Sequence, residues 1–499
     1  MADYDLAIIG GGINGTGIAR DAAGRGLRVL LLEQNDLGSG TSSASTKLIH
    51  GGLRYLEHGA LRLVREALTE REVLLRMAPH VIRPMRFMLP AMPGLRSPFM
   101  LRLGLLLYDW LGARKILPGT RSVDLTHHLT GQPLWRKFRT GFEYSDCRAD
   151  DSRLVALNAL DAAERGAAIR PRTRVTRAER EETWKLILST EGRREAVTAR
   201  VLVNAAGPWV GVVSETVLRI EGPPPVRLAK GSHIVVRKLF DHDRGYIFQN
   251  TDKRIVFALP FAEDFTLIGT TELNFVGALD AVTPSGDEIL YLCRAVNEYF
   301  REPVGPEHVV WAFAGVRALY DTSKGKDKPE DVTRDYHLDL DEKFGAAAVL
   351  TVYGGKITTH RRLAEDVLGR LSHFFQLHRR WTATTPLPGG EFLWDAIETR
   401  VAQTLRAWPF LSEAEAWRLV RAYGTRVDRV LGDAKRRPDI APFFGPLSAA
   451  EVRYLMQHEW AQQPDDVLWR RTKLGLKVSK AEKEALAQFM AGVLADKAV

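Results

Sequence analysis

A glycine-rich segment near the N-terminus limits what this chain can fold into more than any other feature. It reads Gly10-Gly11-Gly12-Ile13-Asn14-Gly15, a G-x-G-x-x-G pattern that directly follows the apolar run at 6–9. Gly10 allows a tight turn, Gly12 lets the backbone approach a pyrophosphate, and Gly15 lets a helix pack closely on a strand. The pattern predicts a strand–turn–helix unit that binds a dinucleotide at the N-terminus of the helix.

An acidic residue lies where such a unit needs one. Glu33 stands 18 positions after Gly15, at the end of a second apolar run at 29–32. A carboxylate there accepts hydrogen bonds from ribose hydroxyls and repels a 2′-phosphate, so NADP is disfavoured. NAD and FAD share this fingerprint, and the residues that follow must distinguish them.

The segment 41–55 favours FAD. It reads TSSASTKLIHGGLRY, with small hydroxyl residues and the pair Gly51-Gly52 interleaved with apolar residues. Such a backbone can lie against a flat or phosphorylated ligand, whereas an NAD domain would continue with a helix and a strand. A later strand-like run at 202–209, LVNAAGPW, is expected to bring the chain back over the nucleotide.

The charge balance favours an anionic partner. The chain has 499 residues and a net charge of +9, from 70 Lys and Arg against 61 Asp and Glu. Phosphorylated metabolites and anionic lipid fit this charge. Nucleic acid is not expected, since no nucleic-acid motif is present. Two cysteines, Cys147 and Cys293, cannot form a disulfide framework, and no Cys/His spacing suggests a metal site.

Longer motifs, in this order, carry a resemblance to a known family: the glycine segment, SSASTKLIHGGLRYLE, VNAAGPW, KGSHIVV, DKRIVF, IGTTE, AFAGVR, TRDY and YGGKITT. The chain resembles the FAD-dependent glycerol-3-phosphate dehydrogenases of aerobic, respiratory type. The fold class that this implies is α/β + α. It combines a Rossmann-like FAD-binding domain of the glutathione-reductase and D-amino-acid-oxidase type, a β-rich substrate domain and a C-terminal all-helical domain.

The resemblance also sets the expected domain boundaries. FAD segments at about 1–75, 145–225 and 310–385 interleave with substrate and membrane segments at about 76–144 and 226–309. A Pro- and Gly-rich linker at 382–390 then leads to the helical domain at 391–499. The implied reaction is oxidation of sn-glycerol 3-phosphate to dihydroxyacetone phosphate by hydride transfer from C2 to flavin N5, with electrons passed to membrane quinone. An oxidase that uses oxygen and releases hydrogen peroxide stays open as the alternative.

The expected FAD contacts come from the glycine turn, the segment 41–55 and three later loops. They are Gly10, Gly12, Ile13, Asn14, Gly15, Glu33, Thr41, Ser42, Ser43, Ser45, Lys47, Leu48, His50, Gly51, Gly52, Val175, Ala206, Gly207, Arg317, Gly355, Lys356, Ile357 and Thr358.

A phosphate-bearing substrate needs arginine forks, and the motifs provide several. The expected substrate contacts are Arg54, Tyr55, Arg254 and Arg334. The expected catalytic residues are His233 and Arg317. Removing the hydroxyl proton calls for a base with a pKa near neutrality, which we assign to His233, with His50 as the second choice. Arg317 is expected to stabilise the alkoxide, although the sequence leaves the division of roles between these two residues open.

The basic, apolar region 96–140 is the candidate membrane contact. On a helix, Phe99, Leu103, Leu106 and Trp110 would share one face, and basic residues flank this stretch. Such a wedge is typical of a monotopic anchor, but a buried core helix explains the pattern equally well. No apolar run reaches the ~18 residues of a spanning helix, and none near the N-terminus is typical of a signal peptide. The family resemblance implies a peripheral protein on the cytoplasmic face of the inner membrane. The resemblance leaves homodimerisation open.

Overall fold

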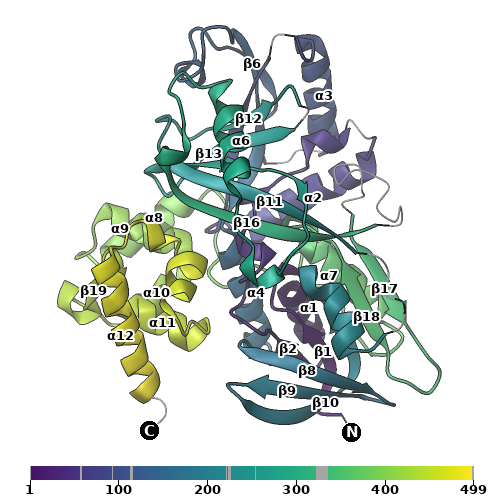
Figure 1. Ribbon diagram of the computed structural model, residues 1–499. Helices are drawn as coiled ribbons and strands as arrows, with labels where there is room; N and C mark the ends of the chain where they lie inside the picture. The colour runs from purple at the N-terminus through teal and green to yellow at the C-terminus, as the bar shows by residue number, and fades with distance from the viewer. Residues whose placement is uncertain are drawn as a thin grey trace.

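The computed structural model describes residues 2–56, 59–92, 94–112, 116–220, 222, 226–252, 254–321 and 335–496, apart from the side chain of Arg54. Two large sheets and a separate C-terminal domain make up the molecule (Figure 1).

The first sheet is the expected dinucleotide-binding unit. Its main path runs in the order β17-β18-β10-β1-β2-β7, and β10 also pairs with the β8–β9 hairpin. β1, β2, β7, β10 and β18 are parallel, so their carboxyl ends meet at one edge. The strands are β1 (Tyr4–Ile9), β2 (Val29–Leu32), β7 (Ala168–Arg170), β8 (Thr173–Arg180), β9 (Trp184–Thr190), β10 (Arg193–Asn204), β17 (His337–Asp341) and β18 (Val349–Tyr353).

Three helices cover one face of this sheet. They are α1 (Ile13–Gly24), α4 (Asp151–Glu164) and α7 (His360–Arg370). Small and branched residues of α1, such as Ile18 and Ala22, are fully buried against Leu6 and Leu31 of the sheet. Glycine and alanine on α1 allow the close approach of helix to strand that the sequence predicted.

The second sheet has ten strands and forms the β-rich domain. Its order is β15-β11-β14-β13-β12-β4-β6-β3, with β16 paired to β11 and β5 to β6. The strands are β3 (Leu48–Ile49), β4 (Ile82–Pro90), β5 (Arg121–Asp124), β6 (Thr140–Ala149), β11 (Val226–Arg237), β12 (Gly245–Gln249), β13 (Ile255–Phe261), β14 (Phe265–Gly269), β15 (Leu273–Asn274) and β16 (Val309–Tyr320).

Helices cover both faces of the second sheet. α6 (Gly286–Asn297) packs its buried residues, including Leu292 and Val296, on one face. α2 (Leu61–Met77) and α3 (Pro98–Leu111) pack on the other. α3 lies at the end of the molecule opposite the two chain termini (Figure 1). No helix among the described residues combines the length and hydropathy needed to cross a bilayer.

The second sheet reaches beyond the boundaries that we expected. β16 runs to Tyr320 and pairs along its length with β11, so the chain returns to the first sheet later than residue 310. β6 likewise continues to Ala149, beyond the expected boundary at 144, and the short β3 joins the second sheet from within the expected first FAD segment. Local hydropathy shows that these stretches are buried strands, but not which sheet they join.

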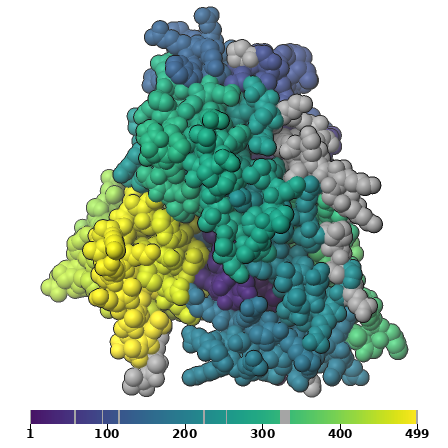
Figure 2. Space-filling view, in the orientation of Figure 1, coloured from purple at the N-terminus to yellow at the C-terminus, as the bar shows by residue number. Residues whose placement is uncertain are grey.

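The C-terminal domain has its own core. α8 (Ile397–Ala407), α9 (Glu413–Tyr423), α10 (Val427–Leu431), α11 (Ala449–His458) and α12 (Lys480–Asp496) enclose it. The expectation of an all-helical domain needs one correction, because β19 (Phe443–Phe444) and β20 (Leu447–Ser448) form a small hairpin. Figure 2 shows this domain, in yellow and yellow-green, packed beside the body of the molecule.

Candidate functional site

A cavity of about 430 Å³ lies between the two sheets, and nearly all the segments singled out in the sequence contribute to its wall. One end is formed by the carboxyl ends of β1 and β2 and the loops that follow them. The other end is formed by β11 and β16 of the second sheet. A single elongated site therefore connects the dinucleotide motif to the candidate catalytic residues.

The glycine turn at the first end is built for close approach. Gly10 has φ +114°, and a Cβ added there would lie 2.4 Å from the carbonyl oxygen of Ala205. A Cβ on Gly15 would lie 1.9 Å from the carbonyl oxygen of Gly10, so α1 could not keep its place beside β1. A Cβ on Gly12 would meet only the Ser42 hydroxyl, at 3.1 Å. Gly12 thus leaves room for a ligand at the start of α1, as the expected pyrophosphate requires.

Glu33, the residue expected to bind the ribose, lines the cavity beside the glycine turn. Its carboxylate accepts hydrogen bonds from the backbone N–H of Gly11 at 2.7 Å and of Asn35 at 2.8 Å. Burial raises the pKa of Glu33, an effect that these two backbone donors oppose. Both Glu33 and Asn35 line the cavity, together with Val175 from β8. The carboxylate is fixed by the turn that it serves, so its position is set before a nucleotide binds.

Most of the expected cofactor residues line the cavity. The exceptions are Gly15, Ser43, Lys47 and Gly51, which do not line the cavity. Gly15 acts through helix packing, and Lys47 is buried with its ammonium group 2.8 Å from the Asp151 carboxylate. Burial lowers the pKa of Lys47 to about 8, against the opposing effect of Asp151. A direct cofactor contact stays a prediction for all the expected residues, those that line the cavity included.

The loop after β18 closes the cavity beside α1. Asn14 donates its side-chain amide to the carbonyl oxygen of Gly354 at 3.1 Å. Its own Oδ1 is buried and has no hydrogen-bond partner in the described protein. Thr358 accepts from the backbone N–H of His50 at 3.3 Å, and the ammonium of Lys356 lies 3.9 Å from the centre of the Tyr55 ring. The Oδ1 atom of Asn14 can accept a hydrogen bond from a bound ligand, and the cofactor has N–H and O–H groups that can donate one.

His233 lies at the far end, on β11 between β14 and β16. Its ring stacks on Phe313 with centroids 4.9 Å apart, and Nε2 lies 2.9 Å from the Thr46 hydroxyl. Nδ1 has no hydrogen-bond partner among the described residues. The ring is buried, and burial together with the nearby Lys47 charge lowers the pKa of His233 to about 3. We expected a pKa near neutrality, and this value corrects that expectation: burial, which the motif does not reveal, keeps the imidazole neutral.

The arginines meet the cavity at the same end. Arg317 on β16 donates to the Glu272 carboxylate at 2.9 Å. Arg254, at the start of β13, lies over the ring of Tyr291 at 5.2 Å and also lines the cavity. The side chain of Arg54 and all of Arg334 lie outside the described residues, so their assignments stay predictions.

Two polar residues of this site escaped the sequence analysis. Thr46 orients His233, and Glu272 pairs with Arg317. Both stand inside motifs that we used for the resemblance, STKLIH and IGTTE. Their presence in conspicuous motifs was the available signal, but pattern alone does not tell which member of a motif faces the cavity.

Comparison with known proteins agrees with this architecture. Residues 5–361 match the family of FAD dependent oxidoreductases, and residues 380–497 match the C-terminal domain of alpha-glycerophosphate oxidase. The chain is 48% identical over 491 residues to a glycerol-3-phosphate dehydrogenase of Pseudomonas aeruginosa, covering 98% of this chain and 95% of that protein. It is 44% identical over 495 residues to the aerobic glycerol-3-phosphate dehydrogenase of Escherichia coli, covering 98% of each.

Another curated relative carries a different name. D-erythritol 1-phosphate dehydrogenase of Brucella abortus is 49% identical over 491 residues, covering 97% of both chains. Among solved structures, the glycerol-3-phosphate dehydrogenase from Bacillus halodurans complexed with FAD shares the fold, with a TM-score of 0.74 and 24% identity over 99% of this chain and 94% of that one.

The family match explains why a dinucleotide turn, a fixed ribose carboxylate and a second sheet enclose one cavity, and FAD is the cofactor that this cavity holds. The chain belongs to the FAD-dependent oxidoreductase family, in the group formed by the bacterial glycerol-3-phosphate dehydrogenases and their near relatives.

Proposed function

We propose that this protein oxidises sn-glycerol 3-phosphate to dihydroxyacetone phosphate and passes the electrons to a membrane quinone. The observation that carries the proposal is the placement of His233, Arg317 and Arg254 together at one end of the FAD cavity. A neutral base and two cations suit a substrate that combines a secondary alcohol with a phosphate. The names of the relatives support the choice of substrate.

The hydroxyl proton goes to His233. Nε2 lies 2.9 Å from the hydroxyl of Thr46, which lines the cavity, so the proton can reach Nε2 through this hydroxyl, whereas Nδ1 is buried. Because the pKa of His233 is about 3, the ring is neutral throughout the physiological range. Phe313 holds the ring plane by stacking.

Arg317 and Arg254 stabilise the negative charges of the alkoxide and of the substrate phosphate. Arg317 lies on the strand next to His233, and Glu272 fixes its guanidinium. In this position it can stabilise the alkoxide that forms as the proton leaves. Arg254 is about one-third exposed and suits the phosphate, which enters from solvent. Bound FAD supplies the acceptor for the hydride that leaves C2.

The exposed face of α3 supports the proposed membrane attachment. Its inward residues Leu101, Leu105 and Tyr108 are buried under the second sheet. The opposite face carries an apolar patch, the α3 patch, which is exposed to solvent: Phe99, Met100, Leu103, Leu106, Leu107 and Trp110. Arg96, just before α3, and Arg102, within it, are exposed basic residues next to this patch. This exposure favours the anchor over the buried-helix alternative, because an exposed apolar face with basic residues beside it suits anionic lipid.

A four-carbon polyol phosphate is the second candidate substrate. The relative named D-erythritol 1-phosphate dehydrogenase is as similar to this chain as the glycerol-3-phosphate dehydrogenases are. Both substrates have a phosphate and a secondary alcohol, so the same base and arginines would serve. The length of the space beside His233 would decide between them.

One anaerobic experiment tests the proposal. The FAD-loaded protein is mixed with sn-glycerol 3-phosphate, D-erythritol 1-phosphate, sn-glycerol 1-phosphate or glycerol, and the loss of oxidised flavin absorbance is followed. We expect fast bleaching by sn-glycerol 3-phosphate and none by glycerol. Faster bleaching by D-erythritol 1-phosphate would assign the second substrate, and no bleaching by either phosphate would refute the proposal. Reoxidation by a soluble quinone and by air is then compared, and faster reoxidation by air with peroxide release would indicate an oxidase.

A further inference from the structure

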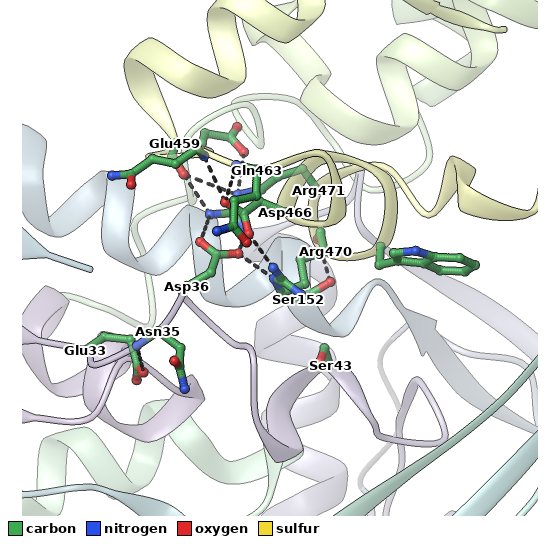
Figure 3. A network of polar contacts seen from close by, with 12 residues as sticks. Glu33, Asn35, Asp36, Ser43, Ser152, Glu459, Gln463, Asp466, Arg470 and Arg471 are labelled. Atoms are coloured by element: carbon green, nitrogen blue, oxygen red, sulfur yellow. Dashed lines mark hydrogen bonds and ion pairs between the residues drawn. The ribbon is translucent and has the colours of Figure 1, made fainter. Parts of the chain in front are cut away.

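A short segment of the C-terminal domain reaches the walls of the FAD cavity through buried charges. It comprises residues 466–473, which begin with the turn Asp466–Arg471 and end at Lys473, and we call it the anchor segment. Figure 3 shows it above the loop of Glu33, Asn35 and Asp36. The contact involves domains that each have their own core.

Arg471 holds the loop after the ribose carboxylate. Its guanidinium donates to the two Asp36 oxygens at 2.8 and 2.9 Å, and Arg470 adds a third bond at 2.5 Å. The side chains of Arg471 and Asp36 are at most 1% exposed. Arg471 also donates to the carbonyl oxygen of Glu459, at 2.7 Å, which ties it to the C-terminal domain. This is a bidentate pair in a dry environment, where geometry is held most strictly.

Asp36 is three residues from Glu33, and the loop between them lines the cavity. The same loop is held from its other side by Arg172, whose backbone N–H donates to the carbonyl oxygen of Asn35 at 2.8 Å. Arg172 in turn donates its side chain to Asp466 at 2.6 Å. Three residues of the anchor segment thus hold the loop from Glu33 to Asp36: Arg470 and Arg471 directly, and Asp466 through Arg172.

Lys473 holds the loop at 43–47 in place through Asp151. Its ammonium lies 3.3 Å from one oxygen of Asp151, and the other oxygen accepts from the Ser45 hydroxyl and from Lys47, both at 2.8 Å. Ser45 lines the cavity, and Thr46 beside it orients His233. The ion pair of Lys473 with Asp151 therefore supports the end of the cavity at which His233 lies.

We propose that the anchor segment positions the FAD site: Arg471 fixes the ribose loop through Asp36, and Lys473 fixes the Ser45–Thr46 wall through Asp151. Its residues act through others and do not touch the cofactor. The inference rests on the proposed function only in taking the cavity to be the site of the reaction.

The chemistry of the contact supports positioning over plain adhesion. Buried ion pairs add little net stability, because desolvation offsets their attraction, and apolar residues would join two domains equally well. A fork between Arg471 and Asp36 instead fixes one distance and one orientation. Such a contact is useful where a loop must keep its shape, as the loop that presents Glu33 must.

The test compares FAD affinity in three variants of the full chain. Asp36→Asn weakens the contact with the Glu33–Asp36 loop at nearly constant side-chain size, and leaves Arg471 with Glu459, which it shares with Arg153. Lys473→Met removes the ion pair with Asp151. Arg426→Met is the matched control, because the pair of Arg426 with Glu164 also joins the two domains but lies at the surface and outside the cavity. Apoprotein is titrated with FAD, well below the unfolding temperature, and flavin fluorescence gives the dissociation constant.

We expect the FAD dissociation constant to rise about 5- to 150-fold in Asp36→Asn, the range typical of coupling between sites. Saturating FAD should restore its turnover. Lys473→Met should lower turnover even when saturated, because the wall beside His233 has moved, and Arg426→Met should match the wild type in both. Folded Asp36→Asn and Lys473→Met variants with unchanged FAD affinity and turnover would overturn the proposal, even if their melting temperatures fell. FAD affinity is measured without substrate, so this result would leave the assigned reaction intact.

Discussion

The α3 patch gives the sharpest test of how this protein meets a membrane. We would replace Leu106 and Trp110, which are 49% and 76% exposed, by glutamate. Full burial of one such side chain is worth about 1.5–3 kcal/mol. Scaled by these exposures, the two residues would contribute about 2–4 kcal/mol on entering lipid, which corresponds to a roughly 30- to 700-fold change in partitioning. Two carboxylates that resist leaving water add to the loss.

The assay is sedimentation with vesicles of anionic phospholipid, together with dye reduction by the unbound protein. The double variant should stay in the supernatant, reduce the dye like the wild type, and melt at the same temperature. Phe344→Glu is the matched control, since Phe344 is fully exposed in the turn between β17 and β18, away from α3. Unchanged sedimentation would refute the anchor. A marked loss of thermal stability would show that the patch is covered within the protein.

Three further predictions concern the cavity. Gly12→Val should fold but lose FAD, measured as flavin per protein. A Cβ at this position meets only the Ser42 hydroxyl, but the valine methyl groups would occupy the space expected for the pyrophosphate. Full flavin content would contradict the placement of the pyrophosphate at Gly12. Arg254→Ala should raise KM about ten-fold and keep its FAD. The effect is modest because the guanidinium is partly exposed to solvent. An unchanged KM would show that Arg254 does not bind the substrate. His233→Asn should slow flavin reduction about 10²- to 10⁴-fold. The ratio of wild-type to variant rate should stay constant from pH 5 to 8, because the wild-type ring is neutral above pH 3. A ratio that shrinks toward pH 5 would mean that the ring titrates near 6.5. The depressed pKa also means that the unfolded chain binds more protons than the folded chain between pH 6.5 and 3. The free energy of unfolding should therefore decrease as the pH is lowered through this window, with a smaller slope in the variant.

The local part of the fold could be predicted from sequence. The strand Val29–Leu32 agrees with the apolar run at 29–32, and the helix Ile13–Gly24 follows the glycine turn as the pattern predicted. Each of these depends on residues close together in the chain. A glycine turn also restricts its surroundings so strongly that few alternatives remain.

The partners of distant segments could not be predicted. β16 has the composition of a buried strand in either sheet, and only its pairing with β11 decides the matter. Asp36 and Arg471 are 435 positions apart, so no local pattern connects them. The low pKa of His233 arises from burial beneath Phe313 and from the charge of Lys47, which are properties of the packed molecule.

The order of strands in the first sheet determines when this protein can acquire its cofactor during synthesis. β1 pairs with β2 early in the chain, but its other neighbour is β10, and β10 in turn pairs with β18 at Val349–Tyr353. The 321 residues between the end of β2 and the end of β18 take the ribosome roughly 15–65 s to make, at about 5–20 residues per second. Until then one edge of β10 lacks its neighbour, and the loop of Gly355, Lys356 and Thr358 does not exist. Nascent chains must therefore wait with an open sheet edge, a state prone to aggregation, and ribosome-bound chains that end before β18 should not retain FAD.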